Sequence, residues 1–179
     1  SEMCIRDSQY LGRKSGKFYP KNERERSNVD QWLFWQMGGL GPMAGQAHHF
    51  RMYAPQFTKE KLTYSKKRYT NEVNRLYGVM NKQLRKNDYL AGRYSIADMA
   101  CWGWVLPSKI STKMQGQKLK EFPHLFKWFE KVGARPAVQK GLDVGKVMRM
   151  LAKASRSGLS EKTKEAKKAR SLLFNQKAR

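Results

Sequence analysis

Apolar residues in this chain recur mainly with the period of an α-helix. One stripe advances in steps of three, four and seven residues: Leu62, Tyr69, Val73, Leu76, Met80 and Leu84. Residues at this spacing share one face of a helix, so the stripe predicts a long amphipathic helix. No stretch alternates apolar and polar residues for long enough to favour a strand. The pattern therefore predicts an all-α fold.

A second helix is expected to open at Trp32 and to be kinked or broken at residues 38–42, where three glycines precede Pro42. Proline has no N–H and its ring clashes with the preceding turn. The glycines do not form a phosphate-binding loop, because no strand precedes them and no Lys-Ser or Lys-Thr pair follows. We expect Gly38, Gly39 and Gly41 to allow close packing at the kink.

The start of a third helix is defined by Ser95 and Asp98. A serine at the N-cap and an acid three residues later can each accept the other's backbone N–H. The apolar run at residues 100–106 predicts a buried helix that ends near Pro107. Asp98 is therefore interpreted as structural, and Cys101 as a small core residue.

A shorter amphipathic helix is predicted after Pro123, and another segment is expected to open at Pro136. All five tryptophans are expected to anchor the core: Trp32, Trp35, Trp102, Trp104 and Trp128. No apolar stretch is long enough to span a membrane. No signal peptide is visible either.

The charge is strongly positive. The 179 residues include 37 Lys and Arg against 14 Asp and Glu, a net charge of +23. Residues 146–179 hold 11 basic and 2 acidic residues and are predicted to form a basic helical or disordered tail. Such a charge favours anionic partners, but no recognised nucleic-acid motif is present.

No metal site is predicted. His48 and His49 are adjacent, and neighbouring residues on a helix point about 100° apart, so they do not converge on one ion. No cysteine or carboxylate stands at ligand spacing from them. His124 is expected at the surface.

Four segments together resemble the glutathione transferase family. The cap box at residues 95–98 and the segment at residues 122–138 resemble the helical C-terminal domain. Residues 31–50 resemble the nu-type bacterial members, described as disulfide-bond oxidoreductases, and the spacing of residues 66–84 agrees. The resemblance implies a C-terminal helical bundle that uses glutathione as substrate, dimerises and needs no metal. It also implies that Gly38, Gly39 and Gly41 lie near the dimer interface.

The same resemblance predicts a domain organisation. Residues 1–8 resemble a translated sequencing adapter, and residues 9–23 resemble the last helix and linker of a thioredoxin-like domain. The helical domain is expected over residues 24–145, followed by the tail. The thioredoxin-like domain is thus expected to be largely absent, and with it the thiol-activating group. No catalytic residue is assigned, and the chain alone is expected to be inactive.

The site that remains is an anion contact and an acceptor surface. The resemblance places Arg68 against a glutathione carboxylate, whereas the residues alone favour a solvated face that Arg68 shares with Lys61, Lys66 and Lys67. The resemblance assigns five candidates to the site of the second substrate, a small disulfide or electrophile: Met43, Gln46, His49, Phe50 and Tyr53. For the five candidates, ordinary core and rim positions are an equally good interpretation.

Two functional classes are weighed. The first is a glutathione-dependent thiol–disulfide oxidoreductase or transferase, expected as a cytoplasmic homodimer. The alternative is a basic module that contacts nucleic acid or anionic surfaces through its tail.

Overall fold

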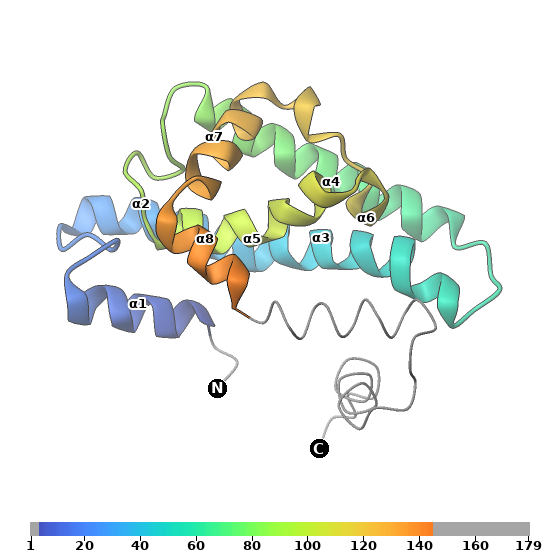
Figure 1. Cartoon of the computed structure of the whole chain (residues 1–179), viewed down its shortest axis with the longest axis horizontal. Helices are drawn as coiled ribbons and strands as arrows, with labels where there is room; N and C mark the ends of the chain where they lie inside the picture. The colour runs from blue at the N-terminus through green and yellow to red at the C-terminus, as the bar shows by residue number, and fades with distance from the viewer. Residues whose placement is uncertain (1–3, 145–179) are drawn as a thin grey trace, which may run out of the picture. The chain divides into compact units, whose positions relative to one another are not determined.

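The computed structural model describes residues 4–144, which form helices without a strand (Figure 1). An isolated bridge joins Ala91 and Arg93. The predicted all-α class is confirmed, whereas the predicted tail at residues 146–179 lies outside the described residues. The elements follow in the order α1 (Cys4–Ser15), α2 (Glu23–Trp35), η1 (Gln36–Leu40), α3 (Gly41–His48), η2 (His49–Tyr53), η3 (Ala54–Gln56), α4 (Thr63–Leu84), α5 (Ile96–Ile110), α6 (Thr112–Gln115), η4 (Leu119–Glu121), α7 (Pro123–Gly133) and α8 (Pro136–Asp143).

The chain divides into two compact units, with the boundary between Val132 and Gly133. In the second unit, α8 opens at Pro136 as predicted, and Gln139 Nε2 donates to the Gly133 carbonyl at 2.6 Å. Within residues 4–144 no helix is long and apolar enough to cross a membrane.

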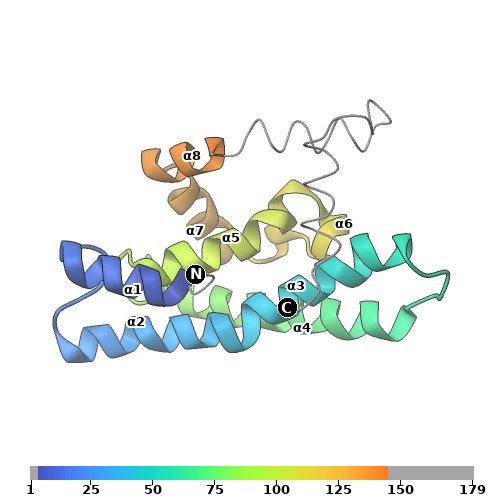
Figure 2. The same ribbon diagram turned by 90° about the horizontal axis from the view of Figure 1, so that it is seen from below.

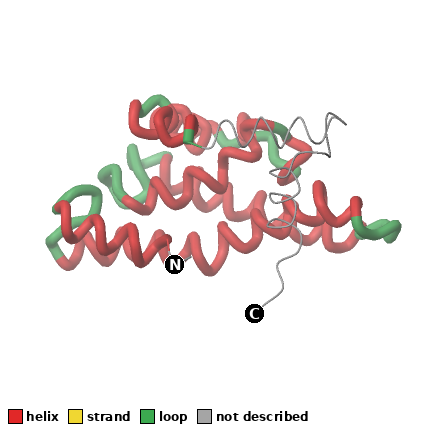
Figure 3. Tube along the Cα trace, turned by 60° about the horizontal axis from the view of Figure 1, so that its bottom comes forward, coloured by secondary structure: helices red, strands yellow, loops and turns green. Residues whose placement is uncertain are grey.

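A kink or break was predicted at residues 38–42, and the structure has no break there but a π-helical turn. Figure 3 shows that α2 continues through η1 into α3 without a loop. The Gly41 N–H donates to the Gln36 carbonyl five residues earlier, and Pro42 lies in the first turn of α3. The wider π turn relieves the contact between the proline ring and the preceding carbonyls, so the helix does not have to end.

Close packing at this turn is confirmed for Gly41 alone of the three glycines. A Cβ on Gly41 would lie 2.7 Å from Gln36 Nε2 and 3.2 Å from Trp104 Cε2, so α3 approaches α5 there. A Cβ on Gly39 would make an ordinary contact, and one on Gly38 would meet no described atom within 4 Å. The absent Cβ matters only where the two helices approach each other.

The predicted stripe on α4 is buried along most of its length. Its members Val73, Leu76, Met80 and Leu84 are core residues. Tyr69 is half-buried, and Leu62 precedes the helix in a left-handed conformation. The pattern missed Tyr77, which is fully buried and donates a hydrogen bond to Gln115 Oε1 at 2.8 Å. Desolvation by burial raises the pKa of Tyr77 and thus favours its neutral, donating form.

The capping box at the start of α5 is confirmed, and its acid does more than close a helix end. Asp98 Oδ2 accepts from the Ser95 N–H at 3.0 Å, while Ser95 Oγ accepts from the Ala97 N–H at 3.3 Å. Asp98 Oδ1 accepts from the Leu90 N–H at 3.1 Å and from Trp128 Nε1 at 2.8 Å. One carboxylate therefore joins α5 to the loop before it and to α7.

The far end of α5 differs from the prediction. The helix continues past Pro107 to Ile110, and the Ser111 N–H donates to the Pro107 carbonyl at 3.0 Å. The carbonyl four residues before this proline belongs to Gly103, which is exposed, so water can satisfy it.

The expectation for the tryptophans is correct for two of the five. Trp128 and Trp102 are buried, and Trp102 stacks on Phe129 with ring centroids 4.9 Å apart. Trp32, Trp35 and Trp104 are half-buried. Periodicity identified residues that lie on helices, but not how much of each side chain a neighbour covers.

The first turn of α7 is capped from another helix. Pro123 opens α7, as predicted. Asn81 Oδ1 on α4 accepts the N–H groups of His124 at 2.9 Å and of Leu125 at 3.1 Å. These are two of the donors that a helix start leaves without an intrahelical partner. His124 is half-buried, so its predicted surface position is only partly correct.

Helix α1 packs against the start of α5 and α2. Gln9 Nε2 and the Tyr19 hydroxyl both donate to Asp30 Oδ1, at 2.9 and 2.8 Å. Ile5 packs against the cluster that includes Tyr19 and Ile96. Helix α1 runs across the boundary expected at residue 8. The adapter origin of residues 1–8 stays a prediction.

Replacing Asp98 by alanine is expected to lower the free energy of unfolding by about 3 kcal/mol. Three buried donors, the N–H groups of Ser95 and Leu90 and the indole N–H of Trp128, would lose their acceptor at once. Urea denaturation measures the change. The matched control is Asp88→Ala, which removes an exposed ion pair with Lys131 and should cost less than about 1 kcal/mol. Equal losses in the two variants would contradict this role for Asp98.

Gly116→Ala is expected to destabilise the fold more than Gly92→Ala. Both glycines have positive φ, 76° and 86°, so both variants incur backbone strain. At Gly116 the new methyl would also lie 2.7 Å from Thr70 Cγ2 and 3.1 Å from Arg51 Cζ, whereas at Gly92 no described atom lies within 4 Å. We expect a difference of about 1–2 kcal/mol in unfolding free energy; indistinguishable denaturation midpoints would show that the neighbours of Gly116 yield freely.

Candidate functional site

The five acceptor-site candidates lie on one continuous helical segment. Met43 and Gln46 belong to α3, and His49, Phe50 and Tyr53 belong to the π-helical segment η2 that follows. Figure 2 shows this segment beside α4, which carries Arg68. Gln46 and His49 are exposed and the other three are half-buried, so these side chains form a partly open surface.

Aromatic contacts link η2 to α4. The Phe50 ring stacks on the Tyr69 ring, with centroids 5.4 Å apart and planes 5° from parallel. The His49 ring meets Phe50 edge-on at 5.2 Å. Since Tyr69 follows Arg68 directly, this stack brings Phe50 to the same part of the fold as Arg68. No hydrogen bond joins Arg68 to Gln46 or His49 within the described residues.

Arg68 is accessible to a ligand. Its side chain is 51% exposed, and its guanidinium lies 3.8 Å from Glu72 Oε2. Arg75 holds Glu72 more tightly, with nitrogen–oxygen distances of 2.7 and 3.0 Å. The hydrogen bond from Arg75 is the main cause that lowers the pKa of Glu72. Glu72 is thus satisfied without Arg68, whose planar donors can turn to a carboxylate.

Arg51 fixes the position of η2, and no sequence pattern had singled it out. Arg51 Nε donates to the Lys113 carbonyl at 2.9 Å, and Nη1 donates to Thr70 Oγ1 at 3.4 Å. The side chain therefore ties η2 to α6 and to α4. Its partners Thr70 and Lys113 lie 19 and 62 positions further along the chain, and local spacing in the sequence does not reveal contacts over such separations.

The two histidines at residues 48 and 49 take part in ring contacts. His48 stacks on Tyr53 at 5.1 Å, and His49 lies 6.4 Å from the same ring. Among residues 4–144, no three His, Cys, Asp or Glu side chains gather where they could hold a metal.

The thiols offer little chemistry to this surface. Cys101 is fully buried in α5, as its assignment to the core predicted. Burial, and then the charge of Asp98, raise the pKa of the Cys101 thiol well above its usual value, so it is held protonated. Cys4 is exposed on α1, remote in sequence from η2 and α4. The site can hold an anion and an apolar group, and a reacting thiol would have to come with a ligand or another domain.

Sequence comparison matches residues 47–142 to the family described as Glutathione S-transferase, C-terminal domain. Among curated proteins, the disulfide-bond oxidoreductase YfcG of Escherichia coli is 45% identical over 134 residues, which are 74% of this chain and 59% of that protein. The disulfide-bond oxidoreductase YghU of E. coli is 36% identical over 136 residues, 74% of this chain and 46% of that protein. The chain thus spans about half the length of these relatives.

The fold also matches solved structures. A glutathione transferase of Pseudomonas putida, solved with one glutathione disulfide per subunit, superposes with a TM-score of 0.69 at 34% identity, covering 76% of this chain and 59% of that one. The family match at residues 47–142 includes His49, Phe50, Tyr53 and Arg68, whereas Met43 and Gln46 lie just before it. This chain belongs to the glutathione S-transferase family and corresponds to its C-terminal helical domain.

Proposed function

We propose that this chain is the helical part of a glutathione-dependent enzyme, a thiol–disulfide oxidoreductase or a transferase. The observation that carries the proposal is the 45% identity to a disulfide-bond oxidoreductase along a helical domain whose solved relatives bind glutathione. The activity belongs to a longer protein, since the chain spans 59% of that relative. The alternative of a basic binding module depended on a tail that lies outside the described residues.

The proposed chemistry consumes two glutathione molecules for each disulfide. The thiolate of the first attacks one disulfide sulfur, forms a mixed disulfide and releases one thiol after protonation. The thiolate of the second attacks the glutathione sulfur of that mixed disulfide, which yields glutathione disulfide and the second thiol. A relative with glutathione disulfide and one with two glutathione molecules per subunit support this stoichiometry. In a transferase, one thiolate would attack an electrophile instead.

Arg68 is proposed to bind a carboxylate of glutathione. Its exposure and the saturation of Glu72 by Arg75 support the assignment, because the guanidinium can form charge-assisted hydrogen bonds without breaking a buried contact. Met43, Gln46, His49, Phe50 and Tyr53 are proposed to border the site of the second substrate. The stack of Phe50 on Tyr69 supports this, because Tyr69 directly follows Arg68 and its ring gives Phe50 an apolar surface to pack on.

We further propose a homodimer in the cytoplasm. Exposed apolar side chains on the α2–η1 segment, Phe34 at 74% and Met37 at 54%, support a subunit interface there. The domain boundaries at residues 24 and 145 remain proposals of the same kind. The buried free thiol of Cys101 agrees with a reducing compartment.

Arg68→Ala is expected to weaken glutathione binding by the complete protein about tenfold, because a charge-assisted hydrogen bond is lost. Titration calorimetry measures the affinity. Lys82→Ala is the matched control: it removes an exposed cation further along the same helix and leaves the ion pair between Arg75 and Glu72 intact. The control should bind within about twofold of the parent. An unchanged affinity in Arg68→Ala would remove this residue from the site.

Catalysis is tested by joining the chain to a thioredoxin-like domain of this family and following glutathione-dependent reduction of bis(2-hydroxyethyl) disulfide. We expect a rate at least about a hundredfold above the uncatalysed reaction. The thioredoxin-like domain and the 179-residue chain, each assayed alone, should fall far below it. A folded, glutathione-binding fusion without reductase or transferase activity would overturn the proposed function.

A further inference from the structure

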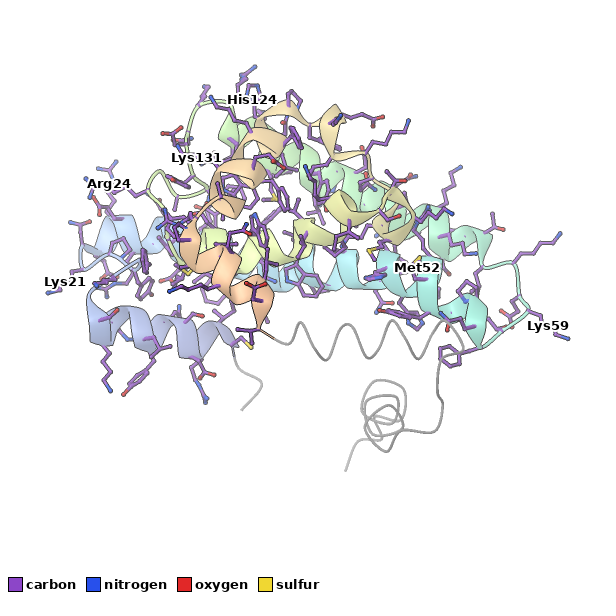
Figure 4. The ribbon with its side chains drawn as sticks, viewed as in Figure 1. Lys21, Arg24, Met52, Lys59, His124 and Lys131 are labelled. Atoms are coloured by element: carbon purple, nitrogen blue, oxygen red, sulfur yellow. The ribbon has the colours of Figure 1, made fainter. Side chains whose placement is uncertain are left out.

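A groove rich in basic side chains lies on the first unit, between the end of α4, the loop at residues 85–92 and α7. Its volume is about 580 Å³. Arg85 and Lys86 line one side of the groove, and Lys127 and Lys131 line the other. Figure 4 shows His124 and Lys131 near the two ends of α7, whereas Lys59 lies in the distant loop between η3 and α4. No role in the proposed glutathione chemistry accounts for this groove.

The loop that forms one wall is held in place by the rest of the fold. Gln83 Nε2 donates to the Leu90 carbonyl at 2.8 Å, and the Leu90 N–H donates to Asp98 at 3.1 Å. Lys131 Nζ lies 3.1 Å from Asp88 Oδ2 and 4.7 Å from the centroid of the Tyr89 ring. These contacts hold the backbone of the loop in place, so less of it has to be ordered when a ligand binds.

The groove carries more positive charge than its own acid can neutralise. Arg85, Lys86 and Lys127 have no acidic partner among the described residues, while Asp88 is engaged by Lys131. Lys127 and Lys131 stand one turn apart on α7, and residues at that spacing are about 5–6 Å apart. Three unpaired cations on two walls fit an anion with several charges close together better than a single carboxylate.

The lining and shape of the groove also bear on two other anionic partners, a nucleic-acid base stack and a membrane surface. Leu84 and Trp128 contribute to the floor but are 7% and 2% exposed, so the indole offers no face on which a base could stack, and the half-buried His124 supplies the one other aromatic ring of this lining. The concave shape does not suit a flat membrane surface. The volume lies within the range typical of small-ligand sites.

We propose that this groove binds a short chain of linked phosphate groups through Arg85, Lys86 and Lys127. The phosphates are the recognised chemistry, and they can be supplied by inorganic polyphosphate or by a nucleoside triphosphate. This site is separate from the surface around Arg68, so it stands or falls independently of the proposed glutathione chemistry.

The test measures binding to the 179-residue chain by titration calorimetry at low salt, with tripolyphosphate, orthophosphate and ATP as probes. Tripolyphosphate should bind at least about tenfold more tightly than orthophosphate, since it reaches cations on both walls. ATP with comparable affinity would assign the site to any triphosphate, and much weaker ATP binding would assign it to inorganic polyphosphate.

Lys127→Glu should reduce tripolyphosphate affinity at least about tenfold, and Lys127→Gln should reduce it less. Lys127 is exposed, so both variants are expected to keep the circular dichroism spectrum of the parent. Lys59→Glu is the control, with the same change of net charge at an exposed position far from the groove. Its affinity should stay within about twofold of the parent.

Equal affinities for tripolyphosphate and orthophosphate would overturn the proposal. Equal losses in Lys127→Glu and Lys59→Glu would do the same, because binding would then follow net charge and not this groove. A single-stranded oligonucleotide that binds more tightly than tripolyphosphate, with the same dependence on Lys127, would overturn the small ligand and assign the groove to a nucleic-acid backbone.

Discussion

The fold depends on a buried carboxylate that has to be satisfied from three directions. Asp98 is fully inaccessible, and burial raises its pKa while the hydrogen bonds from Leu90, Trp128 and Ser95 oppose that rise. A buried charge without such donors would cost several kcal/mol. The start of α5, the preceding loop and α7 therefore have to meet at this point. The loop and α7 are also the walls of the basic groove, so its shape follows from the same requirement.

Features that depend on local spacing could be predicted from the sequence, and those that depend on distant partners could not. The cap at Ser95, the first turn of α7 at Pro123 and most of the α4 stripe needed only a few neighbouring residues. At Pro42 the predicted kink or break takes the form of a π turn, whereas α5 continues past Pro107 to Ile110. Proline removes one donor, and whether a helix then ends depends on what surrounds that turn.

The same distinction holds for the candidate site. Family resemblance indicated Arg68 and the five acceptor candidates, and the structure places Phe50 against Tyr69 beside them. The resemblance did not indicate Arg51, whose partners on α4 and α6 position η2. It did not indicate Asn81 either, which caps the start of α7 from α4. Long-range hydrogen bonds of this kind leave no periodic trace. The described helices thus provide a surface on which a ligand can be held, and the buried Cys101 adds no reactive thiol to it.

The π turn at η1 has a consequence for how this helical segment can change during evolution. In a regular α-helix, adding or removing one residue rotates everything beyond it by about 100° about the helix axis. The π turn closes its hydrogen bond over five residues where an α turn needs four, so the loss of one residue from η1 restores an α turn and leaves the side chains beyond it in place. A second loss before Gly41 has no such reserve: it would turn Ala44 and Ala47, both fully buried, away from the core, and Gly41 away from Trp104. This segment is therefore the place in the long helix where one residue can be lost without changing the direction of the acceptor candidates on α3 and η2.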